Sequence, residues 1–218
     1  MTSSIIEPEF LLKAYACGIF PMAEDREDTE IHWIEPEFRG IIPIDQFHIP
    51  KKLRQTLRNG SHEISIDRNF REVIRACSET NQLREKTWIN KPIEKLYITL
   101  FNMGFAHSVE TYKDGKLVGG LYGVALGGAF FGESMFSRTT DSSKVALCHL
   151  SARLAKSKFK LLDIQFITDH LKQFGALEVS KDQYKTLLFN AVNSNKKFQS
   201  ELTLDELDNF IQSTTHTS

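Results

Sequence analysis

The chain has 218 residues, of which 41% are hydrophobic and 25% are charged, and these values are ordinary for a globular protein with a buried core. Its 27 basic and 28 acidic residues leave a formal net charge of −1. This excludes a global polycation, so any nucleic acid must be bound by a local basic patch. Sixteen Phe residues indicate at least one large apolar core or pocket.

The three cysteines, Cys17, Cys77 and Cys148, are widely separated and fit neither a zinc site nor a disulfide framework. We expect them to be buried thiols in a reducing compartment. The first eight residues lack the basic and apolar regions of a secretory signal. The uncharged run 117–132 is rich in glycine and too short to cross a bilayer as a helix. We therefore expect a cytoplasmic protein.

In the N-terminal half, apolar spacing over residues 5–18 predicts a helix that stops at Gly18. An acidic loop follows, and then a short predicted strand at 31–34 and a change of subdomain marked by Pro36 and Pro43. The next predicted elements are a basic helix over 50–60, a strand at 63–66, a helix around 70–77 and a helix at 92–103.

The C-terminal half begins with a predicted antiparallel meander of three strands, whose first turn is the hairpin signal Asp114–Gly115. Two capping boxes, Ser180…Gln183 and Thr203…Glu206, predict the starts of the last two helices. The predicted ranges are strands at 107–112, 117–126 and 129–136, a helix over 141–157, a strand over 160–167, a helix over 168–174 and a strand at 177–179.

This order of elements is that of a GNAT-like acyltransferase fold of the α/β (α+β) class, with a small N-terminal subdomain. We expect the subdomain at 1–36, the GNAT-like domain at 37–195 and a C-terminal tail with a short helix at 196–218. In such folds the turn after the meander receives the acyl carrier, and a glycine-rich loop usually holds coenzyme A. Here the turn Ser137–Lys144 contains no glycine, which favours a different acyl donor.

Several segments resemble one family: Gly132–Arg138, Leu162–Gln165 running into Thr168–His170, Ala14–Pro21, Thr87–Ile89 and Gly119–Val124. In register from about Glu9 to Tyr184, they resemble the leucyl/phenylalanyl-tRNA–protein transferase family. The chain departs from the family pattern before the first helix, where many members have more residues. It also has Met22 where a Trp is common.

The resemblance implies that Leu or Phe, with Met as a further candidate, moves from aminoacyl-tRNA to proteins that begin with Arg or Lys. The product would enter N-degron proteolysis. No cofactor is expected, because the ester is already activated and no ATP motif occurs. The seven histidines show no metal-ligand spacing, so no metal is expected. The expected partners are Leu-tRNA, Phe-tRNA and these acceptor proteins, with no membrane and a monomer as the default.

Asp163 and Gln165 lie two apart on a predicted strand, so their side chains should share one face. The resemblance implies that this carboxylate and this amide are catalytic: Gln165 would hold the amine or the carbonyl, and Asp163 would orient Gln165 or polarise the amine. Glu133 would bind the acceptor's amine or its basic side chain. Proton transfer and pure positioning both stay open, because an α-amine with a pKa near ~8 needs only a weak proton acceptor.

The resemblance also implies an apolar aminoacyl pocket beside an aromatic platform for the terminal adenosine of the tRNA. Trp88 is the best candidate for stacking on the adenine, and Tyr15 and Tyr97 are weaker candidates. The remaining pocket positions are apolar, and each of them would suit an ordinary core equally well: Leu121, Phe130, Leu147, Leu150, Leu162 and Phe166.

The basic helix is the candidate tRNA contact, through Lys51, Lys52, Arg54 and Arg58. It would bind the phosphates of the RNA backbone and recognise little of the base sequence. By itself, such a helix is more often a solvated face. Two other interpretations stay open. Another GNAT-fold transferase would use acetyl coenzyme A or a peptidoglycan-type donor. A non-catalytic tRNA-binding module would bind tRNA in a salt-dependent way, and its activity would not change when Asp163, Gln165 and Glu133 are replaced.

Overall fold

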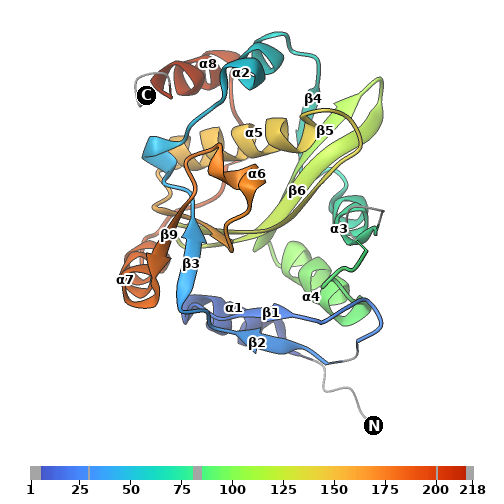
Figure 1. The fold of residues 1–218 in the computed structure, drawn as a ribbon, viewed down its shortest axis with the longest axis vertical. Coiled ribbons are helices and arrows are strands. Elements are labelled where there is room, and N and C mark those ends of the chain that lie inside the picture. The colour runs from blue at the N-terminus through green and yellow to red at the C-terminus, as the bar shows by residue number, and fades with distance from the viewer. Residues whose placement is uncertain (1–5, 29, 81–84, 200, 215–218) are drawn as a thin grey trace.

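The computed structural model of the protein describes residues 6–28, 30–80, 85–199 and 201–214 (Figure 1). Within these residues, the main sheet has seven strands, in the order β4 (Glu63–Ile66), β5 (Ala106–Lys113), β6 (Lys116–Leu126), β7 (Ala129–Ser137), β8 (Leu161–Gln165), β3 (Phe38–Ile41) and β9 (Leu177–Ser180). A separate small sheet pairs β1 (Phe20–Met22) with β2 (His32–Ile34). The protein is therefore of the mixed α/β class.

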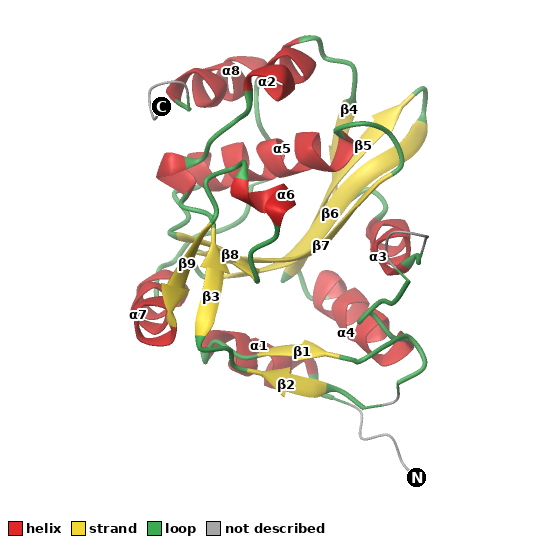
Figure 2. Ribbon diagram, viewed as in Figure 1, coloured by secondary structure: helices red, strands yellow, loops and turns green. Residues whose placement is uncertain are grey.

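Helices cover both faces of the main sheet, and each face has its own hydrophobic core (Figure 2). Neighbouring residues of one strand point into different cores, as Leu161 and Leu162 do, because side chains alternate along a strand. One core includes α1 (Pro8–Ala16), α3 (Phe70–Ser78), α4 (Lys91–Asn102) and α7 (Lys181–Val192). The other includes α2 (Lys51–Arg58), α5 (Ser142–Lys156) and α8 (Leu204–Ser213), with the 3₁₀ turn η1 (Ile44–Gln46) and the short α6 (Asp169–Lys172) packed nearby.

Local sequence signals account for the ends of several elements. Asp114 and Gly115 both have positive φ, 52° and 71°, as the tight turn between β5 and β6 requires. Both predicted capping boxes are present, at the start of α7 and at the start of α8. The parallel neighbours β7 and β8 are connected through α5, which provides the long crossover that such a pair needs. The Asp114–Gly115 turn and the two capping boxes were predicted from the sequence and are confirmed.

The structure corrects the predicted elements in three places. The strands β1 and β3 were not predicted, because each has only three or four residues and β3 lies between Pro36 and Pro43. β3 pairs antiparallel with both β8 and β9 and so completes the sheet. β8 ends at Gln165 and does not continue to residue 167, because Gln165 has a φ of +57°.

The N-terminal segment packs directly on the rest of the protein. Tyr15 of α1 is fully buried in the same core as Tyr97 of α4 and Tyr184 of α7. At the other end of the chain, Phe210 and Ile211 of α8 are buried in the second core. The domain boundaries and the GNAT-like label stay predictions.

Two further sequence expectations can be compared with the structure. Cys77 and Cys148 are buried, but Cys17, the residue that caps the C-terminal end of α1, is exposed. The expectation of a buried thiol was wrong there. Among the described residues, no helix has both the length and the apolar character to cross a membrane.

Candidate active site

The main sheet splits between β7 and β8. Their residue pairs run from Ala129 and Leu161 to Phe131 and Asp163, and the described pairing ends there. At the same level, Gly123 of β6 faces Gly132, whereas Tyr122 faces Ser134, so Glu133 is an extra, bulged residue. Such bulges re-aim side chains and are frequent beside active sites. The split separates the end of β8 from Glu133 and leaves room for a cavity.

A cavity of about 360 Å³ lies at this split. This volume is at the lower end of the range of ~300–1,000 Å³ that is common for small-molecule sites. Of the residues predicted from the sequence, those that line it are Trp88, Leu121, Glu133, Leu147, Leu150, Leu162, Gln165 and Phe166. β6, β7, β8 and α5 thus contribute apolar side chains to the lining of the cavity, and Glu133 and Gln165 line the same space.

Glu133 is held by two buried tyrosines. Tyr15 donates its hydroxyl to Oε1 at 2.6 Å and Tyr97 donates to Oε2 at 2.7 Å, and the two hydroxyl oxygens are themselves 2.5 Å apart. Burial raises the pKa of Glu133 to about 7, although both tyrosine hydrogen bonds act to lower it. Burial, assisted by the charge of Glu133, also raises the pKa of both tyrosines, so they remain hydrogen-bond donors at neutral pH.

Tyr15 and Tyr97, expected beside the adenosine, therefore contact Glu133, and neither is among the described residues that line the cavity. Trp88 does line it and packs edge-on against Tyr97, with 6.5 Å between the ring centroids. Phe130 is fully buried in the core and packs against Phe198 at 5.6 Å; it is absent from the described lining of the cavity.

Gln165 reaches the cavity from the end of β8. Its positive φ interrupts the alternation of the strand, so its side chain lines the cavity together with Leu162 and Ile164. In the orientation of its amide that satisfies the neighbouring groups, the nitrogen donates to the carbonyl oxygen of Gly132 at 2.7 Å. The amide thus bridges the split between β7 and β8.

Asp163 lies behind this surface, fully buried, and is absent from the described residues that line the cavity. Its carboxylate forms an ion pair with the buried Arg39, accepts the Tyr184 hydroxyl at 2.5 Å and accepts the backbone N–H of Gln165 at 2.8 Å. The structure therefore brings Glu133 and Gln165 into one cavity, whereas Asp163 contacts the backbone of Gln165 from outside it.

Three of the four basic residues predicted to contact tRNA form the exposed basic face of α2: Lys51, Lys52 and Arg58. Arg54 is half-buried, and its guanidinium donates to the carbonyl oxygens of Ile49 at 2.8 Å and Thr214 at 3.2 Å. Arg54 therefore ties α2 to the end of α8, beside which α2 lies in Figure 1.

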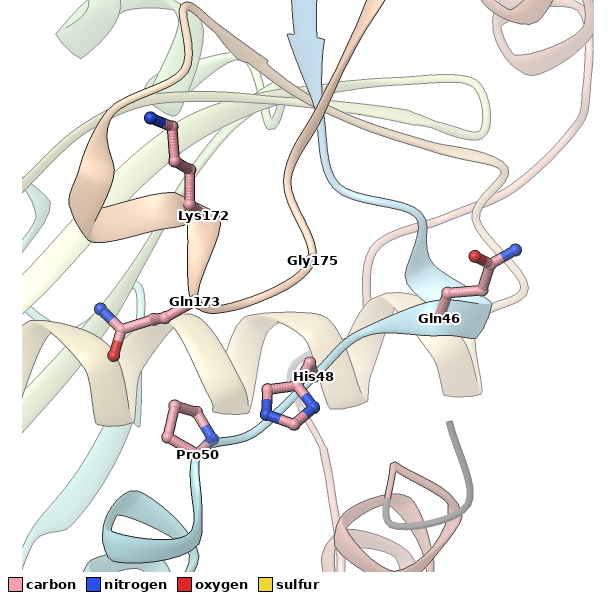
Figure 3. A pocket seen from close by; sticks show the side chains of 6 residues that line it. All are labelled: Gln46, His48, Pro50, Lys172, Gln173 and Gly175. Atoms are coloured by element: carbon pink, nitrogen blue, oxygen red, sulfur yellow. The ribbon is translucent and has the colours of Figure 1, made fainter. Parts of the chain in front are cut away.

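A second hollow, of about 510 Å³, lies between the segment before α2 and the end of α6. Figure 3 shows its polar side chains directed apart, with Gln46 and Lys172 on opposite sides and His48 beside Pro50. They do not converge on one point as catalytic groups do. In the part of the chain that the structure describes, no group of three His, Cys, Asp or Glu residues could hold a metal ion.

Sequence reasoning missed several residues at the site. Phe20 and Met22 of β1 and His170 of α6 line the cavity, and Arg39 and Tyr184 hold Asp163. Phe20 lies inside a segment that carries the family resemblance, which was the available signal for it. Arg39 and Tyr184 had no local signal, because they reach Asp163 from positions 124 and 21 residues away in the chain.

A mixed sheet that splits around an apolar cavity, with a carboxyl and an amide facing its interior, defines an α/β enzyme site in which a polar reaction can occur beside a bound apolar group. The family model described as leucyl/phenylalanyl-tRNA protein transferase matches residues 41–189, and the model of that family's N-terminal domain matches residues 5–37. The chain is also similar to a leucyl/phenylalanyl-tRNA–protein transferase of Paramagnetospirillum magneticum. The two are 53% identical over 196 residues, which cover 90% of this chain and 94% of the relative. The chain belongs to the leucyl/phenylalanyl-tRNA–protein transferase family and is a transferase.

Proposed function

We propose that the protein moves Leu or Phe from aminoacyl-tRNA to acceptor proteins that begin with Arg or Lys. The observation that carries this proposal is the shared cavity, into which Glu133 and Gln165 project from opposite sides of the β7–β8 split. The mostly apolar lining suits the side chain of Leu, Phe or Met, and the printed name of the family and of the relative supports Leu and Phe as donors.

In the proposed reaction, the neutral α-amine of the acceptor attacks the carbonyl carbon of the aminoacyl ester. A C–N bond forms and the C–O bond to the terminal ribose breaks. The proton that the amine loses ends on the released ribose hydroxyl. Because the ester is already activated, the site mainly has to place the two substrates, and neither ATP nor another cofactor takes part.

Gln165 is proposed to hold the attacking amine or the ester carbonyl through its side-chain amide. Glu133 is proposed to bind the acceptor's basic side chain or its amine, because a carboxylate facing an apolar cavity pairs strongly with a cation. Asp163 is proposed to orient Gln165, and its 2.8 Å contact with the Gln165 backbone supports this role.

The donor's side chain is proposed to lie among Leu121, Leu147, Leu150, Leu162 and Phe166, which line the cavity. Trp88 is proposed to stack on the terminal adenine. Tyr15 and Tyr97 are proposed to support this site indirectly, through their hydrogen bonds to Glu133 and the packing of Tyr97 against Trp88. Phe130 is proposed to support the aminoacyl pocket from the core. The exposed basic face of α2 is proposed to contact the phosphates of the tRNA, and Arg54 to hold that helix in place. We also propose that the protein is a cytoplasmic monomer and that its products enter N-degron proteolysis.

The proposal is tested by transfer of radiolabelled Leu or Phe from charged tRNA to a peptide that begins with Arg. Matched peptides that begin with Ala or with acetyl-Arg serve as controls for the N-terminal side chain and for the free amine. We expect label only on the Arg peptide, in a peptide bond. Acetylation of the Arg peptide by acetyl coenzyme A, with no transfer from charged tRNA, would contradict the proposal.

A further inference from the structure

A buried ion pair lies directly behind the cavity and joins three elements. Arg39 of β3 and Asp163 of β8 are 1% and 0% exposed. The Nε of Arg39 lies 3.0 Å from Oδ1, and its Nη2 lies 2.7 Å from Oδ2. Tyr184 of α7 donates its hydroxyl to the same Oδ2 at 2.5 Å. Because buried ion pairs contribute little net stability, this one calls for a role other than holding the fold together.

These contacts use the acceptor capacity of Asp163. A carboxylate offers about four lone-pair sites. Two are directed to the fork of Arg39, one to the hydroxyl of Tyr184 and one to the backbone N–H of Gln165 at 2.8 Å. To accept a proton from a substrate, Asp163 would first have to release one of these donors. Its geometry is that of a group that holds its neighbours.

The neighbour that it holds is in a conformation that needs support. Gln165 has a φ of +57°, which is unfavourable for a residue with a side chain. The chain then turns tightly, with the N–H of Phe166 donating to the carbonyl of Ile164 at 2.7 Å. Gly40 of β3 leaves room for this turn, because a Cβ there would lie 3.0 Å from the carbonyl carbon of Phe166.

Arg39 also connects this turn to the other wall of the cavity. Its Nη1 donates to the carbonyl of Gly18 at 3.2 Å, and its guanidinium lies over the ring of Phe20, 4.4 Å from the centroid. Phe20 lines the cavity, as Gln165 does. One cation therefore contacts both the carboxylate that fixes Gln165 and the aromatic wall contributed by β1.

We propose that Arg39 and Tyr184 are positioning residues for the transfer reaction. They hold the carboxylate of Asp163 so that it fixes the backbone of Gln165, which keeps the Gln165 amide directed into the cavity and toward Gly132. Asp163 then acts through Gln165 and does not take the proton of the amine. This inference rests on the proposed function, because the orientation of the Gln165 amide affects transfer only if both substrates bind in the cavity.

The test uses Tyr184→Phe, which removes one hydroxyl and keeps the ring, whose centroid is 4.8 Å from the Arg39 guanidinium. The matched control is Tyr112→Phe, because Tyr112 also donates its hydroxyl to a buried carboxylate, Glu110, at 2.8 Å. We expect Tyr184→Phe to lower kcat for transfer to the Arg peptide by ~10-fold or more, as the loss of a hydrogen bond to a charged group allows. We expect Tyr112→Phe to keep the wild-type kcat.

Two further readouts distinguish positioning from a loss of stability. The Kd for Phe-tRNA should stay within about twofold of the wild-type value in Tyr184→Phe, because Trp88, the apolar pocket and the exposed basic face of α2 keep their proposed contacts with the charged tRNA. Amide hydrogen exchange at Gln165, followed by NMR in the full chain, should become several-fold faster in Tyr184→Phe and remain unchanged in Tyr112→Phe.

Arg39→Lys provides a second variant, because it keeps the positive charge but loses the two-pronged contact. It should also lower kcat, and Tyr184→Phe decides the question if Arg39→Lys does not fold. Folded Tyr184→Phe with wild-type kcat and wild-type exchange at Gln165 would overturn the inference. A wild-type protein that binds charged tRNA but transfers nothing would instead overturn the proposed function.

Discussion

Replacing Glu133 by Gln removes a charge that burial allows to form only near neutral pH. The pKa of Glu133 is raised from 4.5 to about 7 by burial, against the pull of two tyrosine hydroxyls. With a pKa of about 7, the ionised fraction rises from about 0.1 at pH 6 to about 0.5 at pH 7 and about 0.9 at pH 8. If the carboxylate binds the basic acceptor, kcat/KM for an Arg peptide should follow this fraction.

The acceptor's own α-amine, with a pKa near ~8, titrates in the same range. The ratio of kcat/KM between wild type and Glu133→Gln removes this contribution, because both proteins use the same peptide. Since kcat/KM reports groups of the free enzyme, the ratio should rise about fivefold from pH 6 to pH 7 and less than about twofold from pH 7 to pH 8.

Tyr15→Phe serves as the companion variant for this pH profile. It removes a hydroxyl that lowers the pKa of Glu133, so the midpoint of its own profile should move above that of wild type. A ratio of wild type to Glu133→Gln that stays constant between pH 6 and pH 8 would refute a role for the Glu133 charge in acceptor binding.

Other predictions concern stability, the donor pocket and the tRNA contact. The folded-state pKa of Glu133 is raised from 4.5 to about 7, so wild type should lose stability as pH rises through this window, by up to ~3 kcal/mol relative to Glu133→Gln. A difference in urea-unfolding free energy between the two proteins that is the same at pH 5 and at pH 8 would contradict this. Leu150→Ala should lower kcat/KM for Leu-tRNA by ~10-fold or more beyond the effect of Leu154→Ala, a buried leucine of the same helix outside the described cavity lining; equal kinetics would count against the pocket. Replacing Lys51, Lys52 and Arg58 of the exposed basic face of α2 by neutral residues should reduce the magnitude of the slope of log K for tRNA association against log salt concentration by about 2 to 3. Arg54→Ala should lower the unfolding free energy by about 1–2 kcal/mol and leave that slope unchanged.

Features set by local sequence were predictable. The capping boxes of α7 and α8 and the Asp114–Gly115 turn depend on residues within one turn of chain, and the structure has them. Glu133 and Gln165 were selected through the family resemblance, and both face the cavity. Their roles in catalysis stay predictions.

Features set by long-range pairing were not predictable from one sequence. The bulge at Glu133 exists only because β6 and β7 shift register at Gly123. Gln165, with its positive φ, donates its backbone N–H to Asp163, and Asp163 is paired with Arg39, which is 124 residues distant in the chain. Strand alternation alone therefore placed Asp163 and Gln165 on one face, whereas the turn at Gln165 separates them.

The single-turnover rate of amino-acid transfer in Gln165→Ala tests most directly whether ester and amine meet at the β7–β8 split. With Phe-tRNA and an Arg peptide, we predict a rate at least ~100-fold below wild type, together with an unchanged Kd for the tRNA and an unchanged unfolding midpoint. A folded Gln165→Ala protein that transfers at the wild-type rate would contradict the proposed site.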